Sequence, residues 1–203
     1  MVTAQIDHIR RTNAHRFREL PKRMRWCYPN MVRGLADMCS MLPPDAVGVE
    51  IGCFAGESTT IMLESGVAHL HCVDLWDPDW QPGWWPKTKN VQKSDRMVLA
   101  EATFDKLVSD YSDRITKVKM NSRDALAELK PQGPFDFVYI DADHSYEAVL
   151  SDIDMALRLI HPSGIICGHD ISQTGVFKAV RERLHGVDVR FSDDSWLRYV
   201  ERI

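Results

Sequence analysis

The sequence has few cysteines, and none of them form a closely spaced pair. The five cysteines are odd in number and far apart: Cys27, Cys39, Cys53, Cys72 and Cys167. The absence of any CxxC pair argues against a zinc ribbon or a disulfide framework. Because Cys53, Cys72 and Cys167 lie in apolar runs, we expect them to be reduced thiols packed in the core.

Long apolar runs and an excess of positive charge are also missing. No run approaches the ~18 apolar residues of a membrane span, and the opening residues MVTAQIDHIRR lack the apolar centre of a signal peptide. We therefore expect no membrane association and a cytoplasmic location. The formal net charge of -4 disfavours a broad basic surface, so no nucleic-acid partner is expected. The basic segment 10–25 is interpreted as a solvated helix face.

Apolar runs alternate with helical stretches through most of the chain. Strand-like runs occupy residues 47–52, 69–76, 114–120, 135–142 and 164–170, and helices are expected to begin near Glu57, Lys93, Ser122 and Tyr146. This alternation predicts βαβ units and a doubly wound, mostly parallel sheet.

The two ends of the chain differ from this pattern. Residues 1–42 read as an N-terminal helical extension, which ends at Pro43 and Pro44, and residues 43–203 read as the α/β core of one domain spanning 1–203. Near the C-terminus, two strand-like runs flank the short polar link SDDS, which predicts a hairpin and hence an antiparallel strand.

The segment 75–90 fits neither a helix nor a strand period. It holds four of the six tryptophans: Trp76, Trp80, Trp84 and Trp85. Long loops in compact domains are usually functional, so Trp84 and Trp85 are predicted to form a lid over an acceptor. The alternative is that the tryptophans pack as a small additional core against the N-terminal helices.

The stretch VEIGCFAGEST, residues 49–59, joins the first predicted strand to a helix through Gly52 and Gly56. In doubly wound sheets, ligands bind at the carboxyl ends of the strands near the point where the winding reverses. Asp74 ends the second strand ~20 residues beyond, where an acid can accept hydrogen bonds from a ribose diol. We therefore expect a nucleoside ligand. The NAD fingerprint GxGxxG is missing, which weakens the case for a dehydrogenase.

Acidic side chains also follow two later strands. Asp141 and Asp143 come directly after the apolar run FDFVYI, and His169 with Asp170 ends the run GIICGHD. Because these strand ends meet at one edge of a parallel sheet, the carboxylates are expected to converge on a site for a hard cation such as Mg²⁺.

In this order and spacing, VEIGCFAGEST, HCVDLW, YIDADHSYE and SGIICGHD resemble the motifs of class I S-adenosylmethionine-dependent methyltransferases. More narrowly, the chain resembles small O-methyltransferases of the catechol and caffeoyl-CoA type, and a related group that methylates sugars and antibiotics. The resemblance covers roughly residues 43–203. It implies a Rossmann-like, seven-stranded sheet whose last strand is antiparallel.

The resemblance also implies roles for individual residues. The cofactor-binding set would be Glu50, Gly52, Gly56, Ser58, Asp74, Ser122 and Asp141. Asp74 would hold the ribose, and Ser122 would touch the adenine. The metal set would be Asp141, His169 and Asp170, although the family often has Asp at the position of His169, and histidine is a poor ligand for Mg²⁺. His144 stands where catechol-type relatives have a lysine base, so Asp141 and His144 form the catalytic set.

The favoured function is divalent-metal-assisted O-methylation of a small-molecule hydroxyl, on a phenol or a sugar. The expected cofactors are S-adenosylmethionine and Mg²⁺ or another divalent cation. Two alternatives stay open: a metal-independent methyltransferase acting on nitrogen or a macromolecule, and a non-catalytic nucleoside-binding scaffold. The N-terminal helices offer a contact for a homodimer.

Overall fold

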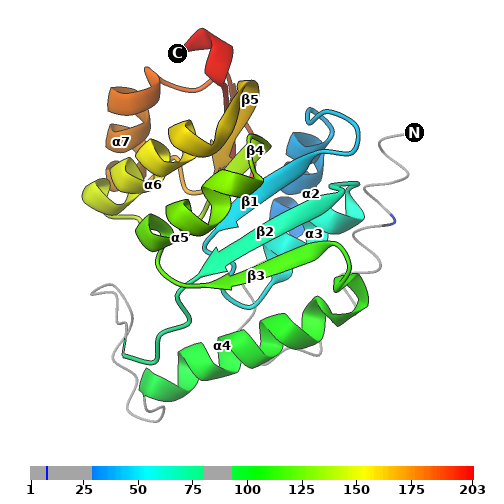
Figure 1. Ribbon diagram of the computed structural model, residues 1–203. Helices are drawn as coiled ribbons and strands as arrows, with labels where there is room; N and C mark the ends of the chain where they lie inside the picture. The colour runs from blue at the N-terminus through cyan, green and yellow to red at the C-terminus, as the bar shows by residue number, and fades with distance from the viewer. Residues whose placement is uncertain (1–7, 9–28, 80–92) are drawn as a thin grey trace.

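A seven-stranded sheet forms the centre of the computed structural model, which describes residue 8, residues 29–79 and residues 93–203 (Figure 1). The strands are β1 (Val47–Ile51), β2 (His69–Asp74), β3 (Ile115–Lys119), β4 (Phe135–Ile140), β5 (Ile160–Gly168), β6 (Val189–Arg190) and β7 (Trp196–Tyr199). The α-helices are α2 (Pro29–Cys39), α3 (Glu57–Glu64), α4 (Lys93–Leu107), α5 (Ser122–Leu129), α6 (Tyr146–Leu159) and α7 (Thr174–Leu184). Three short 3₁₀ helices follow α4, α5 and β7: η2 (Ser109–Tyr111), η3 (Lys130–Gln132) and η4 (Val200–Arg202).

The strand order is β3-β2-β1-β4-β5-β7-β6. Strands β1 to β5 are parallel, whereas β7 runs antiparallel to both of its neighbours, β5 and β6. The predicted doubly wound sheet with an antiparallel C-terminal strand is therefore confirmed, as are the four predicted helix starts. The winding reverses between β1 and β4, because the chain moves outward to β3 and then returns to the other side of β1. This reversal opens a crevice above the carboxyl ends of these strands.

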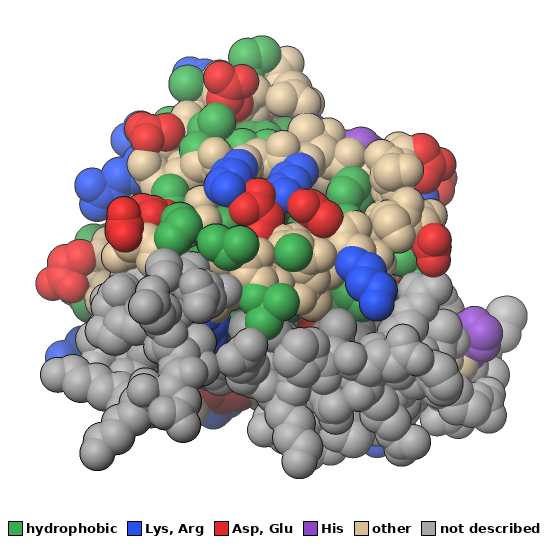
Figure 2. Space-filling model, turned by 90° about the horizontal axis from the view of Figure 1, so that it is seen from below, with side chains coloured by type: hydrophobic (Ala, Val, Ile, Leu, Met, Phe, Trp, Pro, Cys, Tyr) green, Lys and Arg blue, Asp and Glu red, His purple; other side chains and the backbone are tan. Residues whose placement is uncertain are grey.

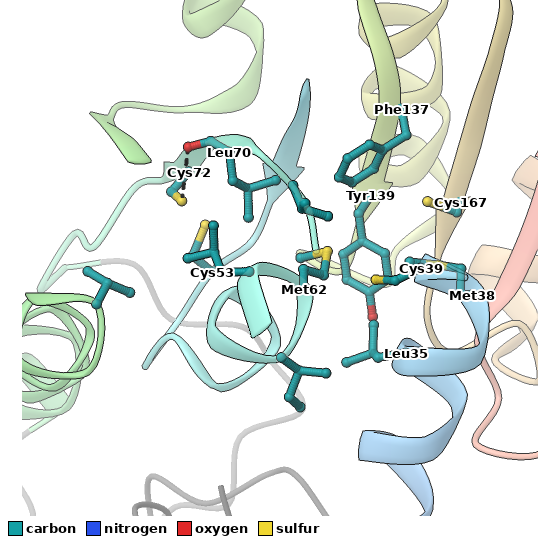
Figure 3. Close-up of a cluster of buried hydrophobic side chains, with 14 of the residues drawn as sticks. Leu35, Met38, Cys39, Cys53, Met62, Leu70, Cys72, Phe137, Tyr139 and Cys167 are labelled. Carbon is teal, nitrogen blue, oxygen red and sulfur yellow. Dashed lines mark hydrogen bonds between the residues drawn. The ribbon is translucent and has the colours of Figure 1, made fainter. Parts of the chain in front are cut away.

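Strand residues alternate between two apolar cores, one on each face of the sheet. Leu70 and Cys72 of β2 face a core shared with α2, α3 and α4, whereas Val73 faces a second core shared with α5, α6 and α7. Figure 3 shows part of the first core, in which the side chain of Tyr139 from β4 points with its hydroxyl end toward Leu35 of α2. Burying both faces accounts for the continuous apolar runs read in the sequence.

The described cysteines belong to these cores and to the turn beneath the crevice. Cys39, Cys53, Cys72 and Cys167 are buried and free of disulfides, as the sequence predicts for the last three. Cys27 lies outside the described residues.

Ion pairs join α4 to the edge strand β3. Lys117 Nζ lies 2.6 Å from Asp105 and 2.9 Å from Glu101, and Lys119 Nζ lies 2.6 Å from Glu101. Figure 2 shows the molecule from below, the side on which α4 lies in Figure 1. Basic and acidic side chains are interleaved on the coloured part of this face, rather than gathered by sign.

Two features of the sequence fall partly or wholly outside the described residues. Outside the described residues lie Trp80, Trp84 and Trp85, so the lid stays a prediction. Most of the N-terminal extension, residues 1–42, also lies outside them, and its helical structure stays a prediction. Trp76 is described and is fully buried. Its ring packs 4.9 Å from that of Phe104, and its Nε1 donates to the carbonyl of Phe54 at 2.8 Å. Trp76 is thus a packing residue that fixes the start of the loop. Within residues 29–79 and 93–203, no helix is long and apolar enough to cross a bilayer.

Candidate active site

A cleft of about 1220 Å³ lies over the carboxyl ends of β1, β2, β3, β4 and β5. The turns that follow these strands supply most of its walls, and the β6–β7 hairpin closes one end. The sheet topology therefore brings to one cavity the motifs that the sequence spreads over more than 120 residues.

The glycine turn after β1 forms the floor of the cleft. Gly52 has φ of 90°, and a Cβ on it would lie 2.2 Å from the carbonyl oxygen of Asp141. Gly56 has φ of 86° and caps the N-terminus of α3. Both positions need glycine, since other residues rarely adopt this region of backbone space. The close approach of Gly52 to Asp141 keeps the ends of β1 and β4 in contact.

Glu50 lies beneath this turn rather than in the cleft. It has no exposed surface, and its two carboxylate oxygens accept hydrogen bonds of 2.5 Å from Ser58 and Thr59 at the start of α3. Burial raises the pKa of Glu50 to about 7, although the two hydroxyl donors act in the opposite direction. Ser58 itself lines the cleft. In this arrangement Glu50 positions Ser58 and the helix start, and does not reach the cavity itself.

Asp74, at the end of β2, lines the cleft and organises the backbone around it. Its Oδ2 accepts from the amide of Phe54 at 2.8 Å, and its Oδ1 accepts from the amide of Trp76 at 3.0 Å. Burial raises the pKa of Asp74, partly offset by these amide donors. Each carboxylate oxygen has a further lone pair, so the acid can still accept from a diol in the cleft.

Ser122, at the first turn of α5, also lines the cleft and donates to Asp152 Oδ1 at 2.5 Å. Asp152 was not singled out in the sequence. It lies on the buried face of α6 with an exposed fraction of 4%, and it lines the same cavity. The sequence pattern that could have identified Asp152 is an acid at a core position of an amphipathic helix, where ionised residues are rare unless paired.

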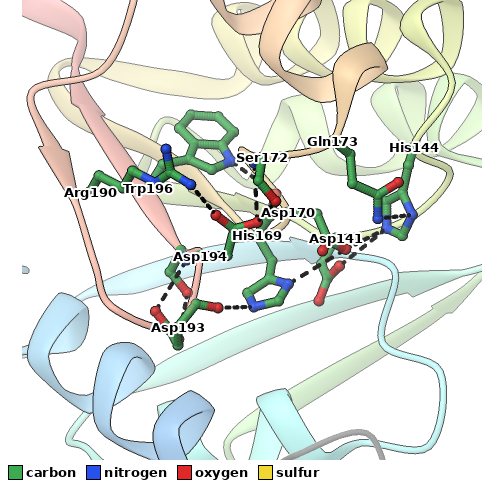
Figure 4. A network of polar contacts seen from close by, with 11 residues as sticks. Asp141, His144, His169, Asp170, Ser172, Gln173, Arg190, Asp193, Asp194 and Trp196 are labelled. Carbon is green, nitrogen blue, oxygen red and sulfur yellow. Dashed lines mark hydrogen bonds and ion pairs between the residues drawn. The ribbon is translucent and has the colours of Figure 1, made fainter.

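At the other end of the cleft, Asp141, His144 and Asp170 form a compact group (Figure 4). His144 Nε2 lies 3.0 Å from Asp170 Oδ2 and 3.7 Å from Asp141 Oδ1. One ligand atom from each of the three residues lies within 4.8 Å of the others. The other ring nitrogen of His144, Nδ1, lies 3.1 Å from the amide Nε2 of Gln173 at the start of α7.

His169 does not join this group, although it precedes Asp170 in the chain. Its Nε2 donates to the carbonyl oxygen of Asp193 at 2.7 Å, and its Nδ1 lies 3.5 Å from Asp170 Oδ2. His169 therefore contacts Asp170 with one ring nitrogen and the turn of the β6–β7 hairpin with the other. At this end of the cleft, the group that could hold a metal ion contains His144 and not the sequence-predicted His169.

Mutual electrostatics fix the charges of this end of the cleft. Burial would lower the pKa of His144, but Asp141 and Asp170 outweigh it and raise that pKa to about 10. In His169, burial again acts downward, and Asp170 with Asp141 raises the pKa to about 9. Asp170 responds in the opposite sense: despite its burial, the two histidines hold its pKa well below the ordinary value. These shifts favour protonated imidazoles at neutral pH beside the ionised carboxylate of Asp170. A protonated His144 requires Gln173 to turn its amide oxygen, in place of its nitrogen, toward Nδ1.

The fold, the glycine turn and the strand-end acids together define a class I methyltransferase. A family model described as a methyltransferase domain matches residues 49–171, more than half of the chain. The chain belongs to this family: it is a class I S-adenosylmethionine-dependent methyltransferase. No curated protein shows significant sequence similarity to it.

Solved structures share the fold at low sequence identity. The cofactor-bound protein Rv0187 from MTB is 20% identical, with a TM-score of 0.61 over 100% of this chain and 88% of that one. An O-methyltransferase from Bacillus cereus, in complex with SAH, is 15% identical, with a TM-score of 0.60 over 96% and 89%. TomG, an O-methyltransferase from Streptomyces achromogenes involved in tomaymycin synthesis, is 16% identical in its complex with SAM, with a TM-score of 0.59 over 95% and 87%.

The cleft is lined by residues that are themselves suited to bind S-adenosylmethionine. Its floor is a glycine turn that lies close to the neighbouring backbone, its middle holds the carboxylate of Asp74, and its far end holds the polar pair of Ser122 and Asp152. Apolar side chains, among them Leu75 and Met120, lie in the same wall.

Proposed function

We propose that this methyltransferase transfers a methyl group to a hydroxyl of a small molecule, with a divalent cation at the acceptor end of its cleft. The convergence of Asp141, His144 and Asp170 in the cleft is the observation that carries this proposal. The bound cofactor supplies a methyl group on a sulfonium, which needs no further activation. The protein has only to align the acceptor oxygen with that methyl and take up its proton.

The three residues fit a divalent cation by type and by distance. Two carboxylates and one imidazole within 4.8 Å of one another suit a single ion of the Mn²⁺, Fe²⁺ or Zn²⁺ class better than Mg²⁺, because of the nitrogen ligand. A cation held there would stabilise negative charge on the acceptor oxygen. Asp141 and Asp170 would hold it, and His144 lies close enough to act as a third ligand or as the proton acceptor.

The charge of His144 couples these two roles. The pKa of His144 is raised because Asp141 and Asp170 stabilise the protonated imidazole. When those carboxylates are neutralised by a cation, the proton on His144 loses its stabilisation. Cation binding therefore favours a deprotonated imidazole beside the acceptor, as a base requires.

The described residues around the acceptor end favour a hydroxyl-rich compound such as a sugar. That end is lined by hydroxyls, an amide and carboxylates: Ser172, Gln173, Ser192, Asp193 and Asp194. Such groups match an acceptor with several hydroxyls better than a planar phenol, which prefers apolar faces. The O-methyltransferases among the similar structures, one of them involved in tomaymycin synthesis, support the broader proposal of transfer to a hydroxyl of a small molecule.

A metal-free reaction is the second candidate, and the contact between His144 and Asp170 favours it. At 3.0 Å these residues form a histidine–aspartate pair, the arrangement that orients a general base. In that case activity would rise with pH toward about 10, as His144 loses its proton.

Titration of Mn²⁺ into the cofactor-loaded protein separates the two candidates. We expect one ion to bind at neutral pH with release of a proton from His144, visible when calorimetry is repeated in buffers of different ionisation enthalpy. Asp170→Asn should weaken binding by about tenfold or more. Asp194→Asn is the matched control, because Asp194 lies in the same cleft but is held by Ser172 and Arg190. Equal affinities for Asp170→Asn and the parent protein, or full methyl transfer in EDTA, would establish the metal-free route.

A further inference from the structure

We infer that Asp152, together with Ser122, recognises the exocyclic amino group of the cofactor's adenine and rejects a 6-oxo purine. The inference rests on S-adenosylmethionine occupying the cleft. It assigns a specificity-determining role to a helix residue that lies apart from the strand-end motifs.

The position of Asp152 is unusual for an acid. It belongs to the apolar face of α6, where the other buried residues are Val149, Ile153, Met155, Ala156 and Leu159. An aliphatic side chain there would extend the core, whereas an ionised one carries a desolvation cost unless it has polar partners. Burial raises the pKa of Asp152 to about 6, with the Ser122 hydroxyl acting in the opposite direction. The carboxylate is still largely ionised at neutral pH.

Within residues 29–79 and 93–203, Asp152 has one hydrogen-bond partner, and its side chain also faces the cleft. Its Oδ1 accepts from Ser122 Oγ at 2.5 Å, and its side chain lines the cleft beside Ser151 and Ala148. A carboxylate has room for further hydrogen bonds at both oxygens. The remaining capacity of Asp152 is thus available to a donor in the cavity.

The direction of the Ser122 hydrogen bond decides what kind of ligand atom fits. Because its hydroxyl proton points to Asp152, Ser122 presents only lone pairs to the cleft. Asp152 is also an acceptor when ionised. Two adjacent acceptors match an amino group, which has two N–H bonds, and they repel the carbonyl oxygen of hypoxanthine or guanine. A buried acceptor left without a donor is costly, so the discrimination is expected to be strong.

The surroundings place a purine edge at these residues. Asp74, the ribose acid, ends β2, and the adjacent strand β3 leads into Met120 and then Ser122. Met120 and Ala148 line the cleft next to the pair and offer apolar surface to the faces of a flat ring. A nucleoside anchored at Asp74 and inserted in this slot would present its far edge to Ser122 and Asp152.

Calorimetry tests the assignment by comparing the affinities of two compounds. One is S-adenosylhomocysteine, the product formed from the cofactor, and the other is its 6-oxo analogue, S-inosylhomocysteine. The parent protein should bind the adenine compound about tenfold to a hundredfold more tightly, the range expected for hydrogen bonds to a charged acceptor. Asp152→Asn should weaken binding of S-adenosylhomocysteine and narrow this ratio, because an amide can turn its NH₂ group toward the 6-oxo oxygen. Asp154→Asn, two residues along the same helix and paired with Arg183, should leave the ratio unchanged.

The outcomes separate this assignment from the function itself. If the parent protein binds both compounds equally, or if folded Asp152→Asn retains the parental ratio, Asp152 is only a structural partner of Ser122 and the assignment is wrong. The comparison of the two compounds on the parent protein remains decisive even if Asp152→Asn does not fold. Failure of the parent to bind S-adenosylhomocysteine would instead overturn both the assignment and the cofactor on which it rests.

Discussion

Glu50 combines complete burial with an ionisable group, and this makes the stability of the protein depend on pH through its carboxyl group. Its folded pKa of about 7 lies above the ordinary value of 4.5 because burial disfavours the charged form. A raised pKa means that the folded state binds the proton more tightly than the unfolded chain. The resulting stabilisation is complete below pH ~4.5 and is lost as pH rises through 7.

Glu50→Gln should therefore flatten the dependence of stability on pH. Between pH 5 and pH 8, the parent protein should lose on the order of 3 kcal/mol more of its free energy of unfolding than the variant. Urea unfolding at several pH values measures this difference. The stabilisation contributed by His144 and His169 is also lost as pH rises, but it is present in both proteins and cancels in the comparison.

Glu128→Gln, at an exposed position of α5, serves as the control and should follow the parent curve. Parallel curves for Glu50→Gln and the parent would mean that Glu50 does not titrate in this range.

The sequence predicted which residue types meet at the site better than it predicted how they pair. Glycines at a strand–helix corner and acids at strand ends follow from local patterns. The cleft is lined by Gly52, Asp74, Asp141 and Asp170, whereas Glu50 is buried beneath the turn and Gly56 caps α3. The hydrogen-bond partners of Glu50 depend on side-chain directions. The same is true of the acidic group, which contains His144 where the sequence predicted His169. His169 is held by a carbonyl 24 residues away in the hairpin, and no local pattern encodes that contact.

At the scale of elements, α2 and the β6–β7 hairpin meet in a tight contact. A Cβ on Gly34 of α2 would lie 1.9 Å from Cγ of Asp193, which sits in the hairpin turn. The carboxylate of Asp193 is held in place by the amide and the hydroxyl of Ser195, at 3.1 and 2.8 Å. The same turn supplies the carbonyl that orients His169. Gly34 thus allows a helix outside the strand-end motifs to support the acceptor end of the cleft.

Gly34→Ala should destabilise the protein by about 1–3 kcal/mol, because the new methyl group displaces the Asp193 side chain from Ser195. In an Asp193→Ala background the collision is absent, and the same change should be neutral or stabilise the helix by up to about 1 kcal/mol. Urea unfolding of the four proteins in this double-mutant cycle measures the coupling. If Gly34→Ala costs the same in both backgrounds, the helix does not rest on Asp193.

The elements themselves were largely predictable, and their contacts were not. The helix starts at Glu57, Lys93, Ser122 and Tyr146 agree with the sequence, because capping signals and apolar periodicity are local. The SDDS link predicted the hairpin for the same reason. The seating of Gly34 against Asp193 joins segments about 160 residues apart in the sequence, and such a contact is set only by packing.

At the scale of the whole molecule, the winding of the sheet converts separate motifs into one reaction cleft. The order β3-β2-β1-β4-β5 places Asp74, the predicted ribose-binding acid, on one side of the glycine turn, and the group of Asp141, His144 and Asp170, the proposed acceptor end, on the other. The cofactor end and the acceptor end therefore lie along a single cavity, with Asp141 close to the backbone of Gly52 between them. This arrangement supports transfer of the methyl group toward His144 and Asp170.

The most direct test of the proposed function is the chemical position of the transferred methyl group. The protein is incubated with S-adenosylmethionine carrying ¹³C in its methyl group and with three separate sets of acceptors: polyols and sugars, phenols, and amines. Carbon NMR then distinguishes a methyl ether from a methylamine. We expect a methyl ether on a hydroxyl compound, and loss of that product in Asp170→Ala with retained binding of S-adenosylhomocysteine. Label found only on nitrogen, or an undiminished ether product from Asp170→Ala, would contradict the account.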